Sequence, residues 1–234
     1  MTKEDFIVLI DRGHGSDTPG KRSPILSDGR QLFEYKWNRE VGVLISEMLS
    51  KYGIKYEIIN PEENDLSLKE RVTRANNIHT KTKNKGGDTI YISVHVNAAG
   101  NGINWMSARG WSAWTSVGKT KGDELADCLY ESAHETFDPL KIKVREDKSD
   151  GDPDYESNFY VVKNTSMPAV LTENFFMDNK NDCEFLLSDE GKRLCAKVHV
   201  DGIIKYMKKK GIEVKPIIAE NYIQNCQFHK CNLV

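Results

Sequence analysis

One stretch near the amino end, residues 6–15, most constrains how this chain can fold. Five apolar residues in succession, starting at Phe6, are followed by Asp-Arg and by a histidine, His14, between two glycines. The run predicts a buried strand that delivers His14 to the edge of a sheet, and Gly13 and Gly15 are expected to let the backbone turn there. The carboxyl ends of strands are where α/β proteins usually keep their chemistry. On its own, however, a histidine in such a turn is more often structural than functional.

The rest of the chain alternates between strand-like and helix-like stretches. Short apolar runs predict further strands over 55–59, 89–96, 110–116, 159–162 and 169–172. Helical spacing of apolar residues predicts helices over 34–53, 67–79, 121–137 and 181–210, the last with a break near Ser188. Strands that alternate with helices predict an α/β sheet covered by helices on both faces.

Composition and length are those of an ordinary globular chain. The 234 residues, 38% hydrophobic and 29% charged, suit one large domain with a short appendage, and we expect a main domain over 1–210 and a tail over 211–234. A net charge of -2 shows no bias toward nucleic acid or an anionic membrane. The amino-terminal apolar run is too short for a signal peptide or a spanning helix, so synthesis in the cytoplasm without membrane insertion is expected.

Several stretches have only structural interpretations at this stage. The five cysteines do not form a disulfide framework, and Cys128, Cys183 and Cys195 are expected to be small buried hydrophobes. A cluster of Cys226, His229 and Cys231 in the tail makes a weak case for a metal site. Residues 138–157 are rich in Asp, Lys, Gly and Pro and predict a surface loop, which is also a candidate lid.

Four residues at element ends are candidates for chemistry. His14, His95 and Glu173 follow or end predicted strands, and Glu34 stands at the start of the first predicted helix. Two imidazoles and one carboxylate make a common catalytic zinc set, and a further carboxylate could take a proton from water. Spacing alone leaves open which glutamate would be the ligand and which the base. Taken alone, Glu34 is best explained as a carboxylate that interacts favourably with the dipole at a helix amino end. Burying the charge of Glu173 among apolar residues, in contrast, costs free energy unless the residue has a functional role or a partner.

Five motifs in register carry a resemblance to a known family. They are Asp11-Arg-Gly-His14-Gly, Glu34-Tyr-Lys-Trp-Asn38, Arg71-Val-Thr-Arg-Ala-Asn76, Ser93-Val-His95-Val-Asn97-Ala and Met167-Pro-Ala-Val-Leu-Thr-Glu173-Asn-Phe-Phe. In this order they resemble the zinc-dependent N-acetylmuramoyl-L-alanine amidases, the type-3 cell-wall amidases of bacterial division, sporulation and phage endolysins. The resemblance covers about residues 5–208.

The resemblance implies a fold, a site and a reaction. It implies a single α/β domain with a mostly parallel twisted sheet, in which His14, Glu34 and His95 bind one zinc ion per chain. Glu173 would be the catalytic carboxylate, acting as general base and then general acid on a zinc-bound water. The reaction would be hydrolysis of the amide between N-acetylmuramic acid and the L-alanine of the stem peptide. The partner is peptidoglycan, and a monomer acting at the cell wall or periplasm, as an endolysin or autolysin, is expected.

Two departures and several secondary residues complete this picture. Arg12 stands where the family usually has a small residue, and Ser16 replaces a frequent glycine. Asn38, Asn97 and Arg71 could orient the ligands, or could serve only as caps, turn residues or surface pairs. Trp105, Trp111 and Trp114 suit the core better than a substrate groove. Two alternatives remain open at this stage: a zinc peptidase acting on another cell-wall bond, and a non-catalytic wall-binding module.

Overall fold

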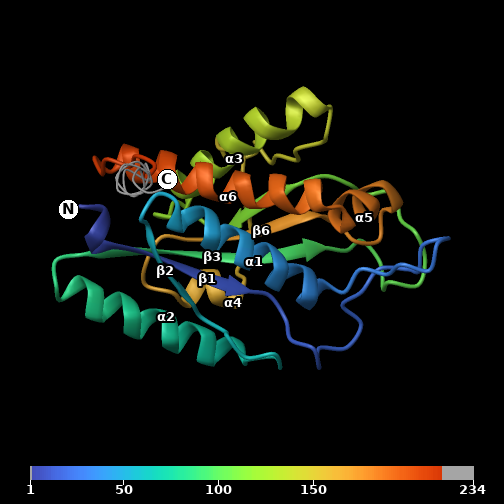
Figure 1. Ribbon diagram of the computed structural model, residues 1–234, viewed down its shortest axis with the longest axis horizontal. Helices are drawn as coiled ribbons and strands as arrows, with labels where there is room; N and C mark the ends of the chain where they lie inside the picture. The colour runs from blue at the N-terminus through green and yellow to red at the C-terminus, as the bar shows by residue number, and fades with distance from the viewer. Residues whose placement is uncertain (1, 218–234) are drawn as a thin grey trace, which may run out of the picture.

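A six-stranded sheet forms the centre of the molecule (Figure 1). The computed structural model describes residues 2–217. In spatial order the strands are β2 (Lys55–Ile58), β1 (Phe6–Arg12), β3 (Asp88–Asn97), β6 (Ala169–Phe176), β4 (Ser112–Thr115) and β5 (Tyr155–Glu156). The first four of these run parallel to one another, whereas β4 is antiparallel to β6, and β5 is parallel to β4. The predicted α/β fold with a mostly parallel sheet is confirmed.

Helices cover both faces of the sheet, as predicted (Figure 1). One face carries α1 (Glu34–Ser50), α3 (Asp123–Phe137), α5 (Lys180–Leu187) and α6 (Asp189–Lys209), and the other carries α2 (Leu68–Lys83) and α4 (Tyr160–Asn164). Val8 and Ile10 of β1 face the larger core, and Leu9 between them faces the smaller one, all three fully buried. Burial on both faces explains why this strand reads as a continuous apolar run rather than an alternating one.

Helix boundaries follow local signals in the sequence. Ser67 caps α2, its hydroxyl accepting the Glu70 amide at 3.2 Å, and Ser188 separates α5 from α6 by capping α6 through the Gly191 amide at 2.9 Å. Gly53, with a φ of 66°, ends the turn that follows α1. Within residues 2–217, no helix is long and apolar enough to cross a bilayer.

One predicted strand and one predicted strand end were wrong. Residues 160–162 belong to a helical turn, α4, which Phe159 precedes, because apolar side chains of this segment pack onto α2, and a run this short has no diagnostic period. The last predicted strand does not end at Thr172 but continues as β6 to Phe176. A register shift opposite β3, where His95 pairs with Glu173 and Asn97 with Phe176, marks a bulge at this point. Glu173 therefore lies within a strand rather than after it.

Residues 138–157 are more ordered than the predicted surface loop. The segment contains a 3₁₀ turn (Asp138–Leu140), a bridge between Trp111 and Val144, and β5. Asp154 is 1% exposed and accepts a hydrogen bond from the Thr115 hydroxyl at 2.6 Å. The segment is thus attached to the edge of the sheet over part of its length.

Cysteines 128, 183 and 195 are free and buried, as predicted, in the larger core. Ile212 and Val214 are also buried there, and the Ile217 amide donates to the Lys51 carbonyl at 2.8 Å. The predicted boundary at residue 210 stays a prediction, and Cys226, His229 and Cys231 lie outside the described residues.

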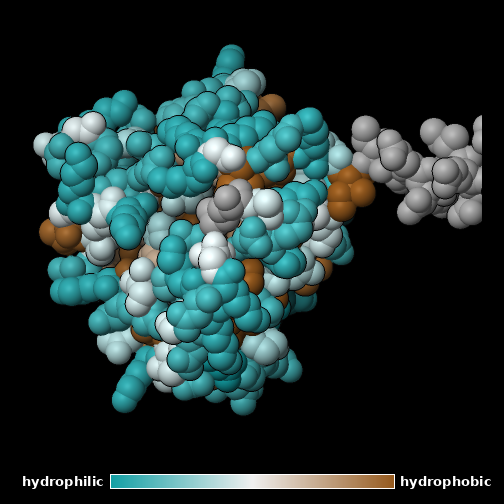
Figure 2. All heavy atoms as spheres, turned by 90° about the vertical axis from the view of Figure 1, so that its left-hand side faces the viewer, coloured by the Kyte–Doolittle hydropathy of each residue, from teal (hydrophilic) through white to brown (hydrophobic). Residues whose placement is uncertain are grey.

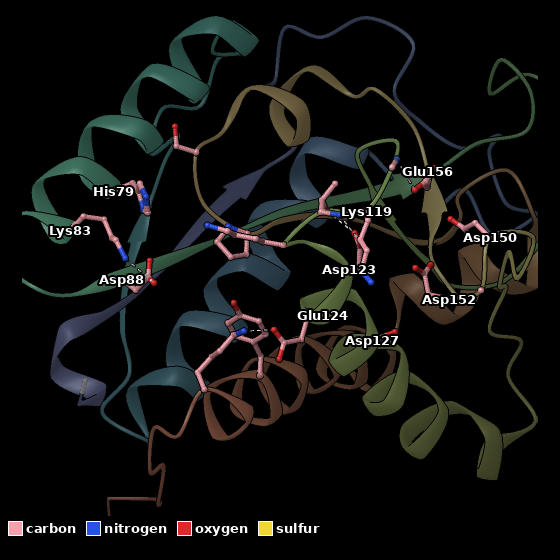
Figure 3. A pocket seen from close by; sticks show the side chains of 18 residues that line it. His79, Lys83, Asp88, Lys119, Asp123, Glu124, Asp127, Asp150, Asp152 and Glu156 are labelled. Atoms are coloured by element: carbon pink, nitrogen blue, oxygen red, sulfur yellow. Dashed lines mark hydrogen bonds and ion pairs between the residues drawn. The ribbon is translucent and has the colours of Figure 1, made fainter.

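The face at the amino ends of the parallel strands is predominantly hydrophilic, with apolar side chains scattered over it (Figure 2). A cavity of about 970 Å³ at this end is lined largely by charged side chains of both signs, among them Lys83, Asp88, Asp123 and Glu124 (Figure 3). It contains none of the four candidate site residues, which lie toward the opposite ends of the strands.

Candidate metal centre

Three of the four candidate residues converge on one point. One ligand atom from each of His14, Glu34 and His95 lies within 4.8 Å of the others. Glu34 Oε1 is 3.4 Å from His14 Nε2 and 3.1 Å from His95 Nδ1. The three come from the turn after β1, the first residue of α1 and the end of β3, so that segments distant in sequence meet beyond the carboxyl ends of parallel strands.

The turn that carries His14 works differently from the prediction. The left-handed residue is His14 itself, with a φ of 63°, and neither neighbouring glycine has a positive φ. The glycines are required by close approach instead: a Cβ on Gly13 would lie 2.3 Å from the His95 ring, and one on Gly15 would lie 1.9 Å from the Asp65 amide nitrogen. The strained backbone of His14 is therefore held between two positions that cannot carry side chains.

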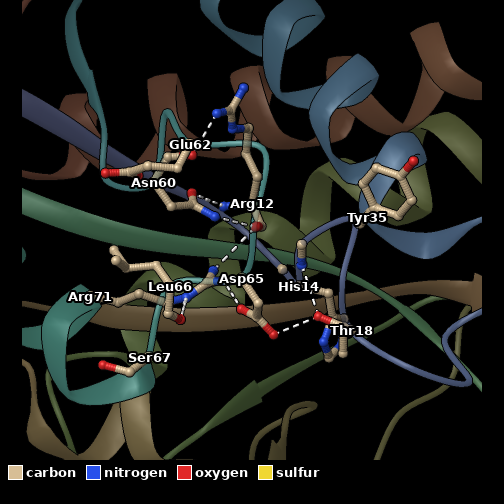
Figure 4. Close-up of polar contacts among 12 residues, drawn as sticks. Arg12, His14, Thr18, Tyr35, Asn60, Glu62, Asp65, Leu66, Ser67 and Arg71 are labelled. Atoms are coloured by element: carbon tan, nitrogen blue, oxygen red, sulfur yellow. Dashed lines mark hydrogen bonds and ion pairs between the residues drawn. The ribbon is translucent and has the colours of Figure 1, made fainter.

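A chain of hydrogen bonds through Thr18, Asp65 and Arg71 holds this turn in place (Figure 4). The Gly15 amide donates to Thr18 Oγ1 at 2.9 Å, and the Thr18 hydroxyl donates to Asp65 Oδ2 at 2.5 Å. Arg71 Nη2 donates to the other oxygen of Asp65 at 2.6 Å. Asp65 thus connects the His14 turn to α2.

Arg71 supports the site through a buried ion pair. Its Nη1 lies 2.5 Å from Asp11 Oδ1, and Asp11 Oδ2 accepts the Ser93 hydroxyl at 2.8 Å. Burial alone would lower the pKa of Arg71, but Asp11 and Asp65 outweigh it and raise the pKa. Of the two roles considered for Arg71, the structure shows the supporting one: it joins β1, α2 and the loop that carries Asp65.

Other secondary residues divide between support and local turns. Asn38 Nδ2 donates to the Gly13 carbonyl at 3.0 Å, and so supports the turn, whereas among residues 2–217 Asn97 Oδ1 accepts only the Ala98 amide. Arg12 turns away from the cluster, where its Nη2 donates to the Asn60 carbonyl at 2.5 Å. Its aliphatic stem packs beside Gly42, where a Cβ would lie 2.8 Å away. This departure from the family pattern therefore leaves the three candidate ligands untouched.

Glu173 lies beside the cluster without joining it. It pairs with His95 across the β3–β6 ladder, and its Oε2 is buried without a hydrogen-bond partner among the described residues. Burial raises the pKa of Glu173 to about 7, with His95 opposing the shift and Glu34 adding to it. For Glu34, burial would also raise the pKa, but the His14 and His95 rings lower it well below its usual value. Two carboxylates with opposite pKa shifts are the usual sign of divided roles.

A pocket of about 240 Å³ opens beside the cluster. Its polar lining includes His14, His95 and Glu173, and the rest of the lining is mixed, with both charged and apolar residues. The apolar lining residues are Leu68, Phe159, Tyr160, Val161 and Leu171. Neither residues 138–157 nor any of the tryptophans lines this pocket. Trp111 is fully buried against Tyr130, which agrees with the expected core role.

Sequence reasoning missed Thr18, Asp65 and Arg39. Arg39 Nη1 donates to the His14 carbonyl at 3.0 Å. A helical spacing from Glu34 places Arg39 on α1, but no local signal indicates its contact with a loop residue. Asp65, two residues before the Ser67 cap, reads as part of a capping segment, and Thr18 reads as an ordinary loop residue.

Comparison with known proteins identifies the family. The family described as N-acetylmuramoyl-L-alanine amidase matches residues 8–205. The chain is 26% identical to an endolysin of Bacillus phage SPP1, over 87% of this chain and 67% of the endolysin. It is also 26% identical to the N-acetylmuramoyl-L-alanine amidase CwlM of Bacillus licheniformis, over 85% of this chain and 67% of CwlM.

Solved structures agree. An N-acetylmuramoyl-L-alanine amidase from Clostridium difficile 630 superposes with a TM-score of 0.69 at 26% identity, covering 88% of this chain and 98% of that one. The amidase AmiC2 of Nostoc punctiforme shares the fold, with a TM-score of 0.69 at 24% identity, covering 87% and 98%. Because the family match spans most of the chain and includes all four candidate residues, the chain belongs to the N-acetylmuramoyl-L-alanine amidases, a family of peptidoglycan hydrolases.

Proposed function

We propose that this amidase is zinc-dependent, that His14, Glu34 and His95 hold one zinc ion per chain, and that Glu173 is its general base and acid. The bond cleaved is the amide between N-acetylmuramic acid and the L-alanine of the stem peptide. The observation that carries the proposal is the meeting of two imidazoles and one buried carboxylate, with a second carboxylate beside them that is not drawn into the cluster.

The residues present fit a zinc ion. Glu34 is 1% exposed, and its Oε2 has no hydrogen-bond partner among the described residues, which is costly for an ionised carboxylate unless a cation completes its environment. Two histidines and one glutamate are a donor set typical of catalytic zinc, in which one coordination position stays open. The low pKa of Glu34 keeps it ionised, as a ligand must be.

Proton transfer in the reaction is assigned to a residue of the chain, Glu173. A bound zinc ion supplies Lewis-acid chemistry, lowering the pKa of water and polarising a carbonyl group. The Glu173 carboxylate takes a proton from the attacking water and, once protonated, donates it to the departing amine of L-alanine. Its raised pKa suits both halves of this exchange near neutral pH. The apolar residues that line the pocket would limit the access of water to the reacting amide.

The test is clearance of purified peptidoglycan sacculi, with EDTA or added zinc, combined with identification of the new end groups. We expect metal-dependent clearance and free L-alanine amino termini on the stem. Glu173→Gln should reduce turnover at least about 100-fold while still binding one zinc, because loss of a general base typically has an effect of this size. Glu70→Gln, on the exposed side of α2, is the matched control and should leave activity unchanged.

Other outcomes point to the alternatives. New amino termini inside the stem peptide would identify a peptidase, and wall binding without cleavage in the presence of zinc would identify a binding module. Near-native activity of Glu173→Gln would show that another group is the base.

Peptidoglycan as substrate places the action at the cell wall. We propose that residues 1–210 form the catalytic unit and that it acts as a monomer, because the four site residues all come from one chain. Sedimentation of the zinc-loaded protein with and without wall fragments checks the monomer.

A further inference from the structure

Lys21 occupies a position shared by two pockets. It lines the pocket of about 240 Å³ that contains His14, His95 and Glu173. It also lines a second pocket of about 200 Å³, whose walls include Phe33 and Tyr35. Lys21 is therefore positioned to contact a ligand in either pocket.

The backbone of Lys21 is fixed relative to the proposed zinc site. Its carbonyl accepts the amide of Glu34 at 3.0 Å, so that Lys21 is joined directly to the residue that begins α1. The next residue, Arg22, forms a β-bridge with Phe33, and the Arg22 amide donates to the Gly20 carbonyl at 3.0 Å. A lysine held in this way extends its side chain from a fixed backbone position beside the pocket.

The ammonium group of Lys21 has no partner within residues 2–217. No ion pair or side-chain hydrogen bond involves it, and the residue is exposed. Arg71, which lines the same pocket, already forms ion pairs with Asp11 at 2.5 Å and with Asp65 at 2.6 Å. Glu173 is close enough for Lys21 to oppose the rise in its pKa, but the two do not pair. The pocket therefore offers one uncommitted positive charge among the residues described.

The chemistry of the substrate limits what this charge can meet. This step rests on the proposed function. On the sugar side of the scissile amide there is no free acid, because the carboxyl group of muramic acid is itself part of that amide. The first ionised group on the peptide side is the carboxylate of the residue that follows L-alanine, in stems where this carboxylate is not converted to a carboxamide. In a substrate without further substituents on the sugar, the free carboxylate nearest the reacting carbonyl therefore lies on the peptide.

We propose that Lys21 is a specificity residue that binds the carboxylate of the second residue of the stem peptide. The enzyme then distinguishes stems in which this group is a carboxylate from stems in which it is a carboxamide. The interaction is an exposed charge-assisted hydrogen bond, whose strength falls as salt screens it.

The experiment uses two soluble disaccharide–peptide fragments that differ only at the second peptide residue, one with a carboxylate and the other with a carboxamide. The zinc-loaded protein should show a kcat/KM about tenfold higher for the carboxylate, the scale of one hydrogen bond to a charged group. Lys21→Met should abolish this preference by lowering only the carboxylate rate, and Lys21→Arg should retain most of it. Lys119→Met, in the separate charged cavity, is the control and should behave as the unmodified protein.

The outcomes separate the subsite from the reaction itself. A general electrostatic effect of Lys21 on Glu173 would change both substrates alike, and so an unchanged preference in Lys21→Met overturns the proposal. If neither fragment is cleaved, the proposed function fails on these substrates. The subsite is then measured by NMR titration with L-alanyl-D-glutamate and with the corresponding amide. Equal affinity for the two peptides, or a preference that survives Lys21→Met, overturns the subsite.

Discussion

Arg71 and Asp11 form an ion pair beneath the candidate metal centre, with Nη1 and Oδ1 2.5 Å apart and both side chains at least 98% buried. The pair joins α2 to β1, and Asp11 in turn accepts the Ser93 hydroxyl of β3. Three elements that frame the site therefore share one buried network.

Breaking this pair on one side should be strongly destabilising. Arg71→Met leaves Asp11 buried and ionised without its partner, and we expect the free energy of unfolding to fall by about 3–5 kcal/mol. Denaturant unfolding of the metal-free protein measures it. Arg30→Ala, which removes an exposed pair with Asp28, is the control and should cause no measurable change. If the free energy of unfolding of Arg71→Met fell by less than about 1 kcal/mol, the residues of this buried network would not stabilise the fold together.

Gly13→Ala should damage metal binding more than folding. A Cβ at this position would lie 2.3 Å from the His95 ring, so that the ring must leave its place in the cluster. We expect zinc affinity, measured by competition with a chelator, to fall about 100-fold. Gly29→Ala is the comparison, because a Cβ there meets no atom within 4 Å, so that its φ of 85° makes it a glycine substitution with backbone strain but without a clash. Equal zinc affinity in both variants would contradict the close packing described for Gly13.

Thr18 should contribute to metal affinity although it is not a candidate ligand. Its hydroxyl accepts the Gly15 amide and donates to Asp65, so that Thr18→Val removes both bonds from the turn that carries His14. We expect zinc affinity to fall about tenfold, with recovery in Thr18→Ser, which restores the hydroxyl. Thr73→Val, on the exposed side of α2, provides a matched control. Unaltered affinity in Thr18→Val would mean that Arg39 and Asn38 hold the turn without it.

His199 should make stability depend on pH. It is fully buried between the Thr172 hydroxyl, at 2.8 Å, and the Cys195 carbonyl, at 2.7 Å, and burial lowers its pKa to about 4. Below its unfolded pKa of about 6.5 the unfolded chain binds a proton that the folded chain refuses, so stability is complete above that pH and falls as the pH drops toward 4. The loss should approach about 3 kcal/mol.

The readout is the difference in pH dependence between two proteins. Denaturant unfolding from pH 4.5 to 7.5 should show a steeper loss in the unmodified protein than in His199→Gln. His79→Gln, at a less buried position, should keep the steep dependence. Identical slopes in the unmodified protein and His199→Gln would remove His199 as the cause.

The sequence predicted the candidate site better than it predicted the support around it. His14, Glu34 and His95 each stand at the end or start of an element, and the carboxyl ends of parallel strands necessarily meet, so element order alone brings them near one another. Glu173 was singled out as a candidate by its residue type in an apolar context. Its position within β6, rather than after it, depends on a bulge that has no signature in the sequence.

What could not be predicted is set by distant contacts. Thr18 and Asp65 are 47 residues apart, and their hydrogen bond depends on how two loops meet after the sheet has formed. The helical turn at 160–164 follows from packing on α2, which decides between helix and strand where an apolar run is too short for its period to do so. The requirement for Gly13 likewise appears only once the His95 ring is in place.

His14 and Glu34 lie at the two ends of one connecting segment, from the turn after β1 to the first residue of α1. A metal held by both would act as a cross-link that closes this segment into a loop, in the same way that a disulfide closes the chain between two cysteines. Lys21 lies inside that loop, so a bound ion would further restrict the backbone of the residue proposed to select the substrate. Metal binding and the proposed recognition of the stem peptide would then depend on the same closed loop of chain.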